Sequence, residues 1–190
     1  PKEAKVNYVI DMAQPYFLDS IAYLRYPHYA DSLIQSTRSQ SVLKSEENFN
    51  VLKLEEERQR LSNLFRNHGY YYYRPEFTTY RADTLQKSGY VSLQVVPRNG
   101  IPAEAKKQYY IGNTSVYLTG YDNEPPTDTL RLRTMTFYYS GKKPGIRLNA
   151  LMRNMFFRKG ELFSQDRQTF TQEAIARMGV FRYSEFRYEP

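Results

Sequence analysis

Two stretches of the chain combine a helical pattern of apolar residues with a glycine and an aromatic segment. In the first stretch, apolar side chains recur at helical spacing between residues 51 and 65, and charged residues fill the opposite face, which predicts an amphipathic helix. Gly69 is predicted to end this helix, because glycine takes a left-handed conformation without steric cost. The surrounding segment, NHGYYYYRPEF, is rich in tyrosine, which favours extended structure, so we expect a strand over residues 70–82.

The same pattern occurs again near the C-terminus. There, QEAIARMGVFRYSEF contains a predicted helix before Gly179 and aromatic residues after it. Each helix has a similar lead-in, SEENFN or KGELFS, in which a hydrophobic residue precedes a polar residue suited to cap the helix. Further upstream, YFLDSIAYLRY from Tyr16 and YYIGNTSVYL from Tyr109 both begin as strands. We infer two copies of one structural unit.

The first copy has the predicted element order βααββ. Its strands are expected at residues 16–26, 70–82 and 89–97, and its helices at residues 29–38 and 51–68. Two helices and three strands pack most economically as a two-layer sandwich, so the fold class is α+β with tandem βααββ domains. The second copy follows the same order, and we expect it to be truncated before its final strand.

These patterns divide the chain into three parts. Residues 1–13 include KVNYVIDMA, which alternates as a strand, and we predict that they are the final strand of a preceding repeat. Residues 14–98 and 106–190 are the two predicted repeats. The second repeat is longer between its first strand and its long helix, which predicts an inserted hairpin at about residues 120–147.

Positive charge is concentrated in this insertion. The chain has a formal net charge of +7, and no acidic residue occurs between Asp128 and Glu161. Anionic lipid headgroups are one expected partner of such a surface, and a solvated face without a partner is the alternative. The predicted membrane-facing or partner-facing basic residues are Arg131, Arg133, Lys142, Lys143 and Arg147.

Catalytic and metal-binding patterns are weak. The chain has no cysteine, and its two histidines, His28 and His68, have no spaced ligand motif around them, so we expect neither a metal nor another cofactor. Residues 41–44 match S-x-x-K, but the partner motifs S-D-N and K-T-G are absent. We therefore expect that the chain is not an enzyme.

The βααββ order, the lead-ins NFN and ELFS, the helix endings RNHGYYYY and RMGVFRY and the strand opening YYIGNTSVYL together resemble POTRA domains. These domains occur in outer-membrane assembly factors of the BamA and TamA type, in the surface antigen family, and the resemblance is to Bacteroidetes-like members. It implies an array in the periplasm that is attached to the outer membrane through a downstream C-terminal β-barrel. It also implies unfolded outer-membrane proteins, or other subunits of the assembly complex, as partners.

An edge strand is the predicted docking site for such clients. Pro75 lies in the strand predicted at residues 70–82, and proline is tolerated chiefly in edge strands. An edge offers backbone groups to an extended client segment by β-augmentation, and flanking aromatic residues add contact area. The alternative is that these aromatic side chains only divide between core and surface. The predicted docking residues are Tyr71, Tyr73 and Phe77 in the first copy and Phe181, Tyr183 and Phe186 in the second.

A nucleic-acid-binding module is the alternative function. Small αβ domains with basic patches and aromatic strand residues stack bases, which requires aromatic residues aligned with arginines on an open sheet face. Salt-dependent binding to single-stranded DNA or RNA distinguishes this module from an assembly factor, for which we expect no nucleic-acid partner.

Overall fold

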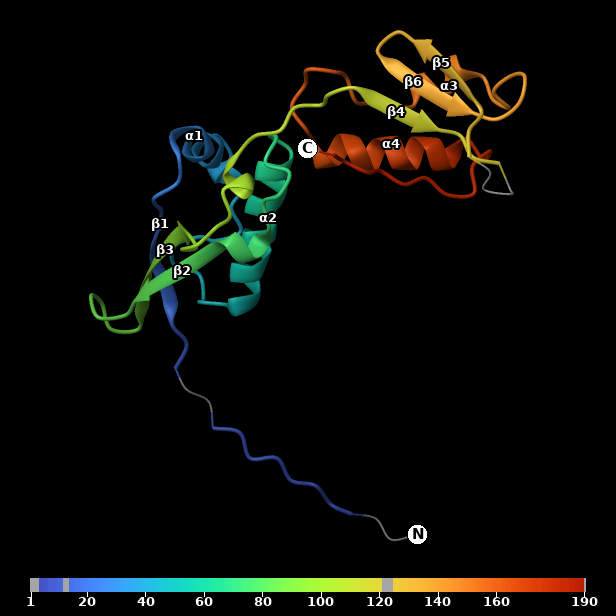
Figure 1. Cartoon of the computed structure of the whole chain (residues 1–190). Helices are drawn as coiled ribbons and strands as arrows, with labels where there is room; N and C mark the ends of the chain where they lie inside the picture. Colours follow the sequence, from blue (N-terminus) through green and yellow to red (C-terminus); the bar gives the residue numbers. More distant parts are fainter. Residues whose placement is uncertain (1–3, 12–13, 121–124, 190) are drawn as a thin grey trace. The chain divides into compact units, whose positions relative to one another are not determined.

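The structure is a computed structural model that describes residues 4–11, 14–120 and 125–189. It has a mixed α+β fold with two three-stranded sheets and accompanying helices (Figure 1). The chain divides into two compact units, of which the first comprises Pro1–Leu61 and Pro75–Asn99 and the second comprises Ser62–Arg74 and Gly100–Pro190. None of the helices in the described residues is long and apolar enough to span a bilayer.

The first unit has the predicted order βααββ. Strand β3 lies in the middle of its sheet, parallel to β1 and antiparallel to β2. The elements are β1 (Phe17–Tyr23), α1 (His28–Ser36), α2 (Val51–Arg66), β2 (Thr78–Asp83) and β3 (Tyr90–Pro97). Two 3-10 helices, η1 (Arg38–Gln40) and η2 (Pro75–Phe77), lie in its connections.

Alternating residues of β3 contribute to the core of this unit. Val91, Leu93 and Val95 are buried, as the period of two in a strand with one covered face requires. Helix α2 approaches this sheet, because the hydroxyl of Tyr80 in β2 donates a hydrogen bond of 2.6 Å to the carbonyl oxygen of Leu54. The first unit is therefore built from a sheet and a helical layer.

A buried carboxylate connects α2 to β1. Glu57 is fully buried and accepts hydrogen bonds from the Tyr23 hydroxyl at 2.5 Å and from the Val42 amide at 3.1 Å. Arg60 donates two more, at 2.6 and 3.0 Å, and the Tyr23 hydroxyl lies 2.9 Å from the Ser41 hydroxyl. Burial and the hydrogen bond to Glu57 raise the pKa of Tyr23 to about 12. Because both carboxylate oxygens have donors, the charge is tolerated inside the unit.

The second unit has a sheet with the same spatial order but a different chain order. Strand β6 lies in the middle, parallel to β4 and antiparallel to β5. The elements are η3 (Glu104–Lys106), β4 (Thr114–Tyr117), β5 (Asp128–Leu132), β6 (Met135–Tyr139), α3 (Leu148–Arg153) and α4 (Gln165–Arg177). Its core contains buried residues of β6, of both helices and of the chain after α3: Met135, Phe137, Leu148, Leu151, Met155 and Ile175.

The hairpin β5–β6 lies in the predicted insertion and takes a specific place in the sheet. In the first unit, β3 pairs in parallel with the first strand and antiparallel with β2. In the second unit, β6 pairs in parallel with β4 and antiparallel with β5. The inserted hairpin β5–β6 therefore pairs with β4 in the same way as the hairpin β2–β3 pairs with β1. In the chain, however, β5–β6 comes before the helices of its unit, whereas β2–β3 comes after them.

The repeat is also visible in the backbone beside each first strand. Three equivalent hydrogen bonds join each lead-in to the segment at or just before the first strand of its unit. In the first unit they run from Glu46 N to Leu18 O, from Leu18 N to Glu47 O and from Phe49 N to Tyr16 O. In the second they run from Gly160 N to Ile111 O, from Ile111 N to Glu161 O and from Phe163 N to Tyr109 O. The second residue of each lead-in is left-handed, since φ is 64° at Glu46 and 86° at Gly160.

The strand predicted at residues 70–82 is wrong over its first part. Gly69 has the expected positive φ of 93°, but the chain then turns back on the helix, and the Tyr70 amide donates to the Phe65 carbonyl at 3.1 Å. Tyr70 and Tyr73 both pack their rings against Phe65, at centroid distances of 5.7 and 4.6 Å. Because this spacing of three residues belongs to a turn, regular pairing begins only with β2.

The strand expected after Gly179 is also wrong. Residues 180–189 form no strand. In the first unit, the strand after the long helix is β2, which pairs with the central strand β3. In the second unit, the central strand is β6, and its antiparallel partner is β5 of the inserted hairpin. Phe181 and Phe186 instead pack against the core of the second unit.

The N-terminal segment forms no strand over residues 5–11, and its apolar side chains are exposed. Residues 12–13 lie outside the described residues. A strand needs a partner, and the described residues offer this segment none. Its assignment to a preceding repeat stays a prediction.

The units differ from the predicted repeats at residues 14–98 and 106–190, because residues 62–74 belong to the second unit. Asn67 explains part of this grouping. Its side-chain oxygen accepts from the Asp166 amide at 2.9 Å, and its side-chain nitrogen donates to the Asp166 carboxylate at 2.8 Å. Gly69 contributes too, since its carbonyl accepts from the Tyr109 amide at 2.8 Å.

Candidate functional site

Strand β2 is an edge strand of the first sheet, and some of its backbone groups face outward. The Arg98 amide donates to the Phe77 carbonyl at 2.7 Å, which makes these two residues a hydrogen-bonded pair across β2 and β3. Antiparallel pairs alternate between hydrogen-bonded and non-hydrogen-bonded positions. The backbone N–H and C=O groups of Tyr80 and Ala82 therefore point away from β3.

The opposite edge of the same sheet is covered. Residues 46–49 lie along the start of β1 and form an antiparallel bridge between Phe17 and Asn48. An added strand would have to displace this lead-in at β1. At β2 it would meet the groups of Tyr80 and Ala82 directly, so the first unit presents one edge suited to β-augmentation.

The side chains along β2 hold this edge in place. Tyr80 is half-buried, and its ring lies 5.2 Å from the Arg58 guanidinium. Burial raises the pKa of Tyr80 above its ordinary value, so the phenol stays protonated and keeps its hydrogen bond to α2. Arg81 and Ala82 are exposed. The backbone of this edge is therefore held in place by Tyr80, and the side chains that follow Tyr80 along β2 are small or flexible.

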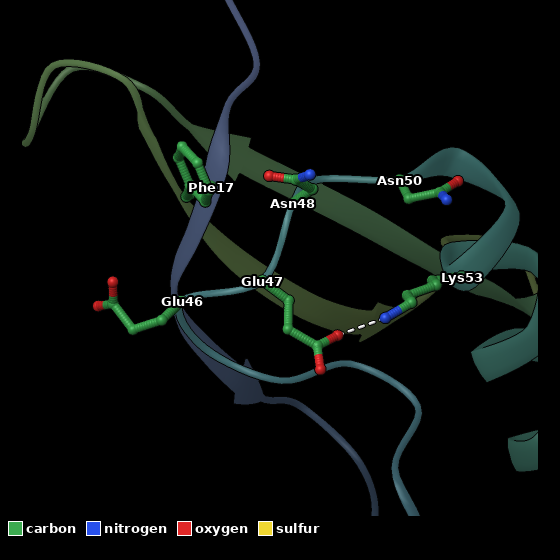
Figure 2. A pocket seen from close by; sticks show the side chains of 6 residues that line it. All are labelled: Phe17, Glu46, Glu47, Asn48, Asn50 and Lys53. Atoms are coloured by element: carbon green, nitrogen blue, oxygen red, sulfur yellow. Dashed lines mark hydrogen bonds and ion pairs between the residues drawn. The ribbon is translucent and has the colours of Figure 1, made fainter.

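A shallow hollow lies beside the bridge between β1 and residues 46–49 (Figure 2). Glu47 and Lys53 point toward each other there and form an ion pair, whereas Glu46 points away. The hydrogen bond from Lys53 holds the pKa of Glu47 below its usual value. Since acid and base neutralise each other, this hollow is a weak candidate for a ligand site.

The predicted docking tyrosines lie elsewhere. Tyr71 packs in the second unit against Phe163 and Tyr188, with ring centroids 4.9 and 5.1 Å away. Tyr73 is buried against Phe65. Neither residue lies on a strand, and of the first three predicted docking residues only Phe77 lies next to β2. The placement of Tyr71 and Tyr73 along a sheet edge is therefore corrected.

The other three predicted docking residues also lie off any strand. Phe181 and Phe186 pack against the core of the second unit, and the Phe186 ring lies 5.8 Å from that of Phe157. Tyr183 is 69% exposed. These three side chains do not form one aromatic row, because the segment that carries them is not extended within a sheet.

The five predicted basic residues are all exposed, and none forms an ion pair with a described acid. Arg131 lies in β5, and Arg133 lies in the tight turn before β6 with φ of 55°. Lys142 and Lys143 follow β6, whereas Arg147 is the N-cap residue of α3. The structure thus distributes them along the hairpin and the start of a helix.

Two tyrosines that were not predicted as site residues form a pair on the second sheet. Tyr117 of β4 and Tyr138 of β6 are register partners, and their rings stack with centroids 4.6 Å apart and planes 8° apart. The alternation in TSVYL and MTFYY is a sequence signal that could have placed each of them on the face opposite the apolar residues. The described residues hold no cluster of three side chains suited to bind a metal.

Comparison with solved structures identifies the fold. BamA from Haemophilus ducreyi lacking POTRA domains 1–3 matches with a TM-score of 0.56 at 12% sequence identity, over 90% of this chain and 25% of that chain. The fold is that of POTRA domains. POTRA3–5 of Haemophilus influenzae BamA matches with a TM-score of 0.49 at 11% identity, over 92% of this chain and 55% of that chain.

POTRA1–3 of the periplasmic domain of Omp85 from Anabaena gives a TM-score of 0.32 at 13% identity, over 88% of this chain and 57% of that chain. The assignment of the POTRA fold rests on the Haemophilus ducreyi structure. This chain spans about half of the Haemophilus influenzae chain and a quarter of the Haemophilus ducreyi chain. No protein-family model and no curated protein matches the sequence.

Proposed function

We propose that the chain is a periplasmic scaffold region of an outer-membrane β-barrel assembly or translocation factor, and that it docks extended client segments by β-augmentation at β2. The POTRA fold supports the scaffold role. The proposed partners are unfolded outer-membrane proteins or other subunits of the assembly complex. A downstream β-barrel of the same protein would attach the region to the outer membrane, and the region would act without catalysis or a cofactor. A Bacteroidetes-like origin and membership of the surface antigen family stay predictions.

One observation carries the docking proposal: the two edges of the first sheet differ. The β1 edge is covered by three hydrogen bonds from its lead-in, whereas the backbone groups of Tyr80 and Ala82 point outward from β2. Main-chain hydrogen bonds need no particular client sequence, so such an edge suits a scaffold that handles many extended segments.

Proline substitution at Ala82 tests this edge. Ala82→Pro removes an N–H group that points away from β3, so the pairing with β3 is retained, and proline is tolerated at such edge positions. Ala82→Val is the matched control, because it keeps the N–H group. We expect a strand peptide with alternating aromatic and polar residues, taken from an outer-membrane β-barrel, to bind the unchanged chain and Ala82→Val but to lose at least tenfold in affinity for Ala82→Pro.

Amide hydrogen exchange gives a second measurement that does not depend on a variant. The peptide should slow exchange at Tyr80 and Ala82 while leaving residues 46–49 unchanged. Circular dichroism checks that Ala82→Pro keeps its fold. Equal affinity for the proline and valine variants, or protection at residues 46–49 instead of β2, would refute docking at this edge.

A further inference from the structure

The second sheet has one face that its helices leave uncovered. Met135 and Phe137 of β6 pack with residues of α3 and α4, and Val116 of β4 and Leu132 of β5 join them. Side chains alternate between the two faces of a strand, so their neighbours project from the opposite side. This opposite side, here called the outer face, consists of Ser115, Tyr117, Thr129, Arg131, Thr136 and Tyr138.

The outer face carries the stacked tyrosine pair. Tyr117 and Tyr138 lie opposite each other across the parallel pair β4 and β6, and their centroid distance of 4.6 Å is close to the spacing of about 4.8 Å between neighbouring strands. The rings therefore stack along the direction from strand to strand. Tyr117 remains 63% exposed, so a phenol with an apolar body and a polar tip meets the solvent.

One cation shares the outer face with this pair, and three more lie at the two ends of the hairpin. Thr129 is the register partner of Tyr138, which places Arg131, two residues further along β5, on the same face and diagonal to that ring. Arg133 marks one end of the hairpin, and Lys142 and Lys143 follow its other end. All four are exposed, and no acidic residue occurs in the sequence between Asp128 and Glu161.

We propose that the outer face, together with Arg133, Lys142 and Lys143, binds the surface of an anionic lipid bilayer. A tyrosine side chain has an apolar ring and a polar hydroxyl. Tyrosine is therefore enriched at the headgroup level of a membrane, where the ring contacts apolar groups and the hydroxyl stays hydrated. Cations close to an anionic bilayer are attracted to its surface potential. Cations without an ion-pair partner among the described residues lie near the exposed Tyr117 and the half-buried Tyr138, and this combination complements such a surface.

Single-stranded nucleic acid fits the outer face less well. Recognition of bases on a sheet uses aromatic rings with open faces on which successive bases stack. Each ring of the pair Tyr117 and Tyr138 covers one face of the other, with planes 8° apart. The pair therefore leaves at most one face of each ring for a base, besides the hydroxyl ends and the ring edges. This lipid-binding inference is independent of client docking at β2.

Co-sedimentation of the whole chain with vesicles tests the proposal. We expect binding to vesicles of phosphatidylglycerol and phosphatidylcholine that weakens as salt is raised, and no binding to vesicles of phosphatidylcholine alone. Lys142→Gln with Lys143→Gln should reduce binding roughly tenfold or more, since each cation near an anionic surface contributes on the order of fivefold. Tyr117→Ser should also weaken binding, but it should leave the salt dependence unchanged.

A matched pair of exposed lysines serves as the control. Lys106→Gln with Lys107→Gln makes the same change in net charge at exposed residues in and beside η3, away from the outer face in sequence and on another element. We expect a loss of less than about twofold for this control. Equal losses for both lysine pairs would overturn the proposal, as would unchanged binding in Lys142→Gln with Lys143→Gln. Tighter binding to single-stranded RNA than to anionic vesicles, lost in Tyr117→Ser, would also overturn it.

Discussion

Glu57→Gln removes a buried charge while keeping the size of the side chain. Glu57 is fully buried and accepts four hydrogen bonds, of which two come from Arg60. The amide nitrogen of glutamine is a donor, so at least one of these donors would face another donor. The guanidinium of Arg60 would also lose its counter-charge. We expect a substantial loss of stability in the first unit.

The size of this loss follows from the exposure of Arg60. Removing one partner of a buried ion pair costs about 3–5 kcal/mol, because the remaining charge is left without compensation. The Arg60 side chain keeps 15% of its surface exposed, so water relieves part of that cost and the lower end, about 3 kcal/mol, applies. With a urea dependence of about 2 kcal/mol per molar, the unfolding midpoint should fall by about 1.5 M.

Urea titration of the whole chain, followed by circular dichroism, measures this change. Amide exchange in peptides from β1 and β3 assigns it to the first unit. Glu55→Gln is the matched control, because Glu55 lies on the same helix with its side chain 62% exposed and pairs with Arg58 at the surface. Such a pair contributes well under about 1 kcal/mol. A midpoint shift for Glu57→Gln no larger than that for Glu55→Gln would refute the role of the buried carboxylate.

Two further predictions concern Tyr23 and the two helix-ending glycines. The folded-state pKa of Tyr23 is raised to about 12 from 10.0, so its contribution to stability is present below pH 10 and is lost as the pH rises from 10 to 12. Tyr23→Phe should remove this part of the pH dependence in urea titrations at pH 9 to 12, and an unchanged profile would contradict the assignment. Gly69→Ala should cost about 2–3 kcal/mol, because φ is 93° and the added methyl would lie 2.7 Å from Leu162 Cδ2. Gly179→Ala, with φ of 67° and open space around it, should cost only about 1 kcal/mol, so equal midpoint shifts in urea would contradict the close approach at Gly69.

Local periodicity was sufficient to predict the helices and most strands of the first unit. The spacing of apolar residues predicted a helix over residues 51–68, and α2 spans Val51–Arg66. Asn50, the residue chosen as its cap, accepts a hydrogen bond of 2.8 Å from the Leu52 amide through its side chain. These features depend on residues within one or two turns, so a single sequence contains the information for them.

The tyrosine run was predicted less well because its structure depends on distant residues. Strand propensity favoured extended backbone from Tyr70 onward. Tyr71 instead packs against Phe163 and Tyr188, which are far away in the sequence. The docking edge was consequently placed several residues too early, and the outward backbone groups of Tyr80 and Ala82 were missed. Register, which decides which groups face outward, cannot be read from composition.

The position of the hairpin in the chain differs between the two units, and this has a consequence for folding. In the first sheet, Leu18 of β1 pairs with Val91. In the second sheet, Val116 of β4 pairs with Phe137, and the loop that this pairing closes is roughly three to four times shorter. Since the entropy of loop closure grows as (3/2)RT ln n, the shorter loop lowers this barrier by about 1 kcal/mol. The second sheet therefore closes through contacts that are more local in the sequence than those of the first sheet, which favours faster formation of its strand pairs.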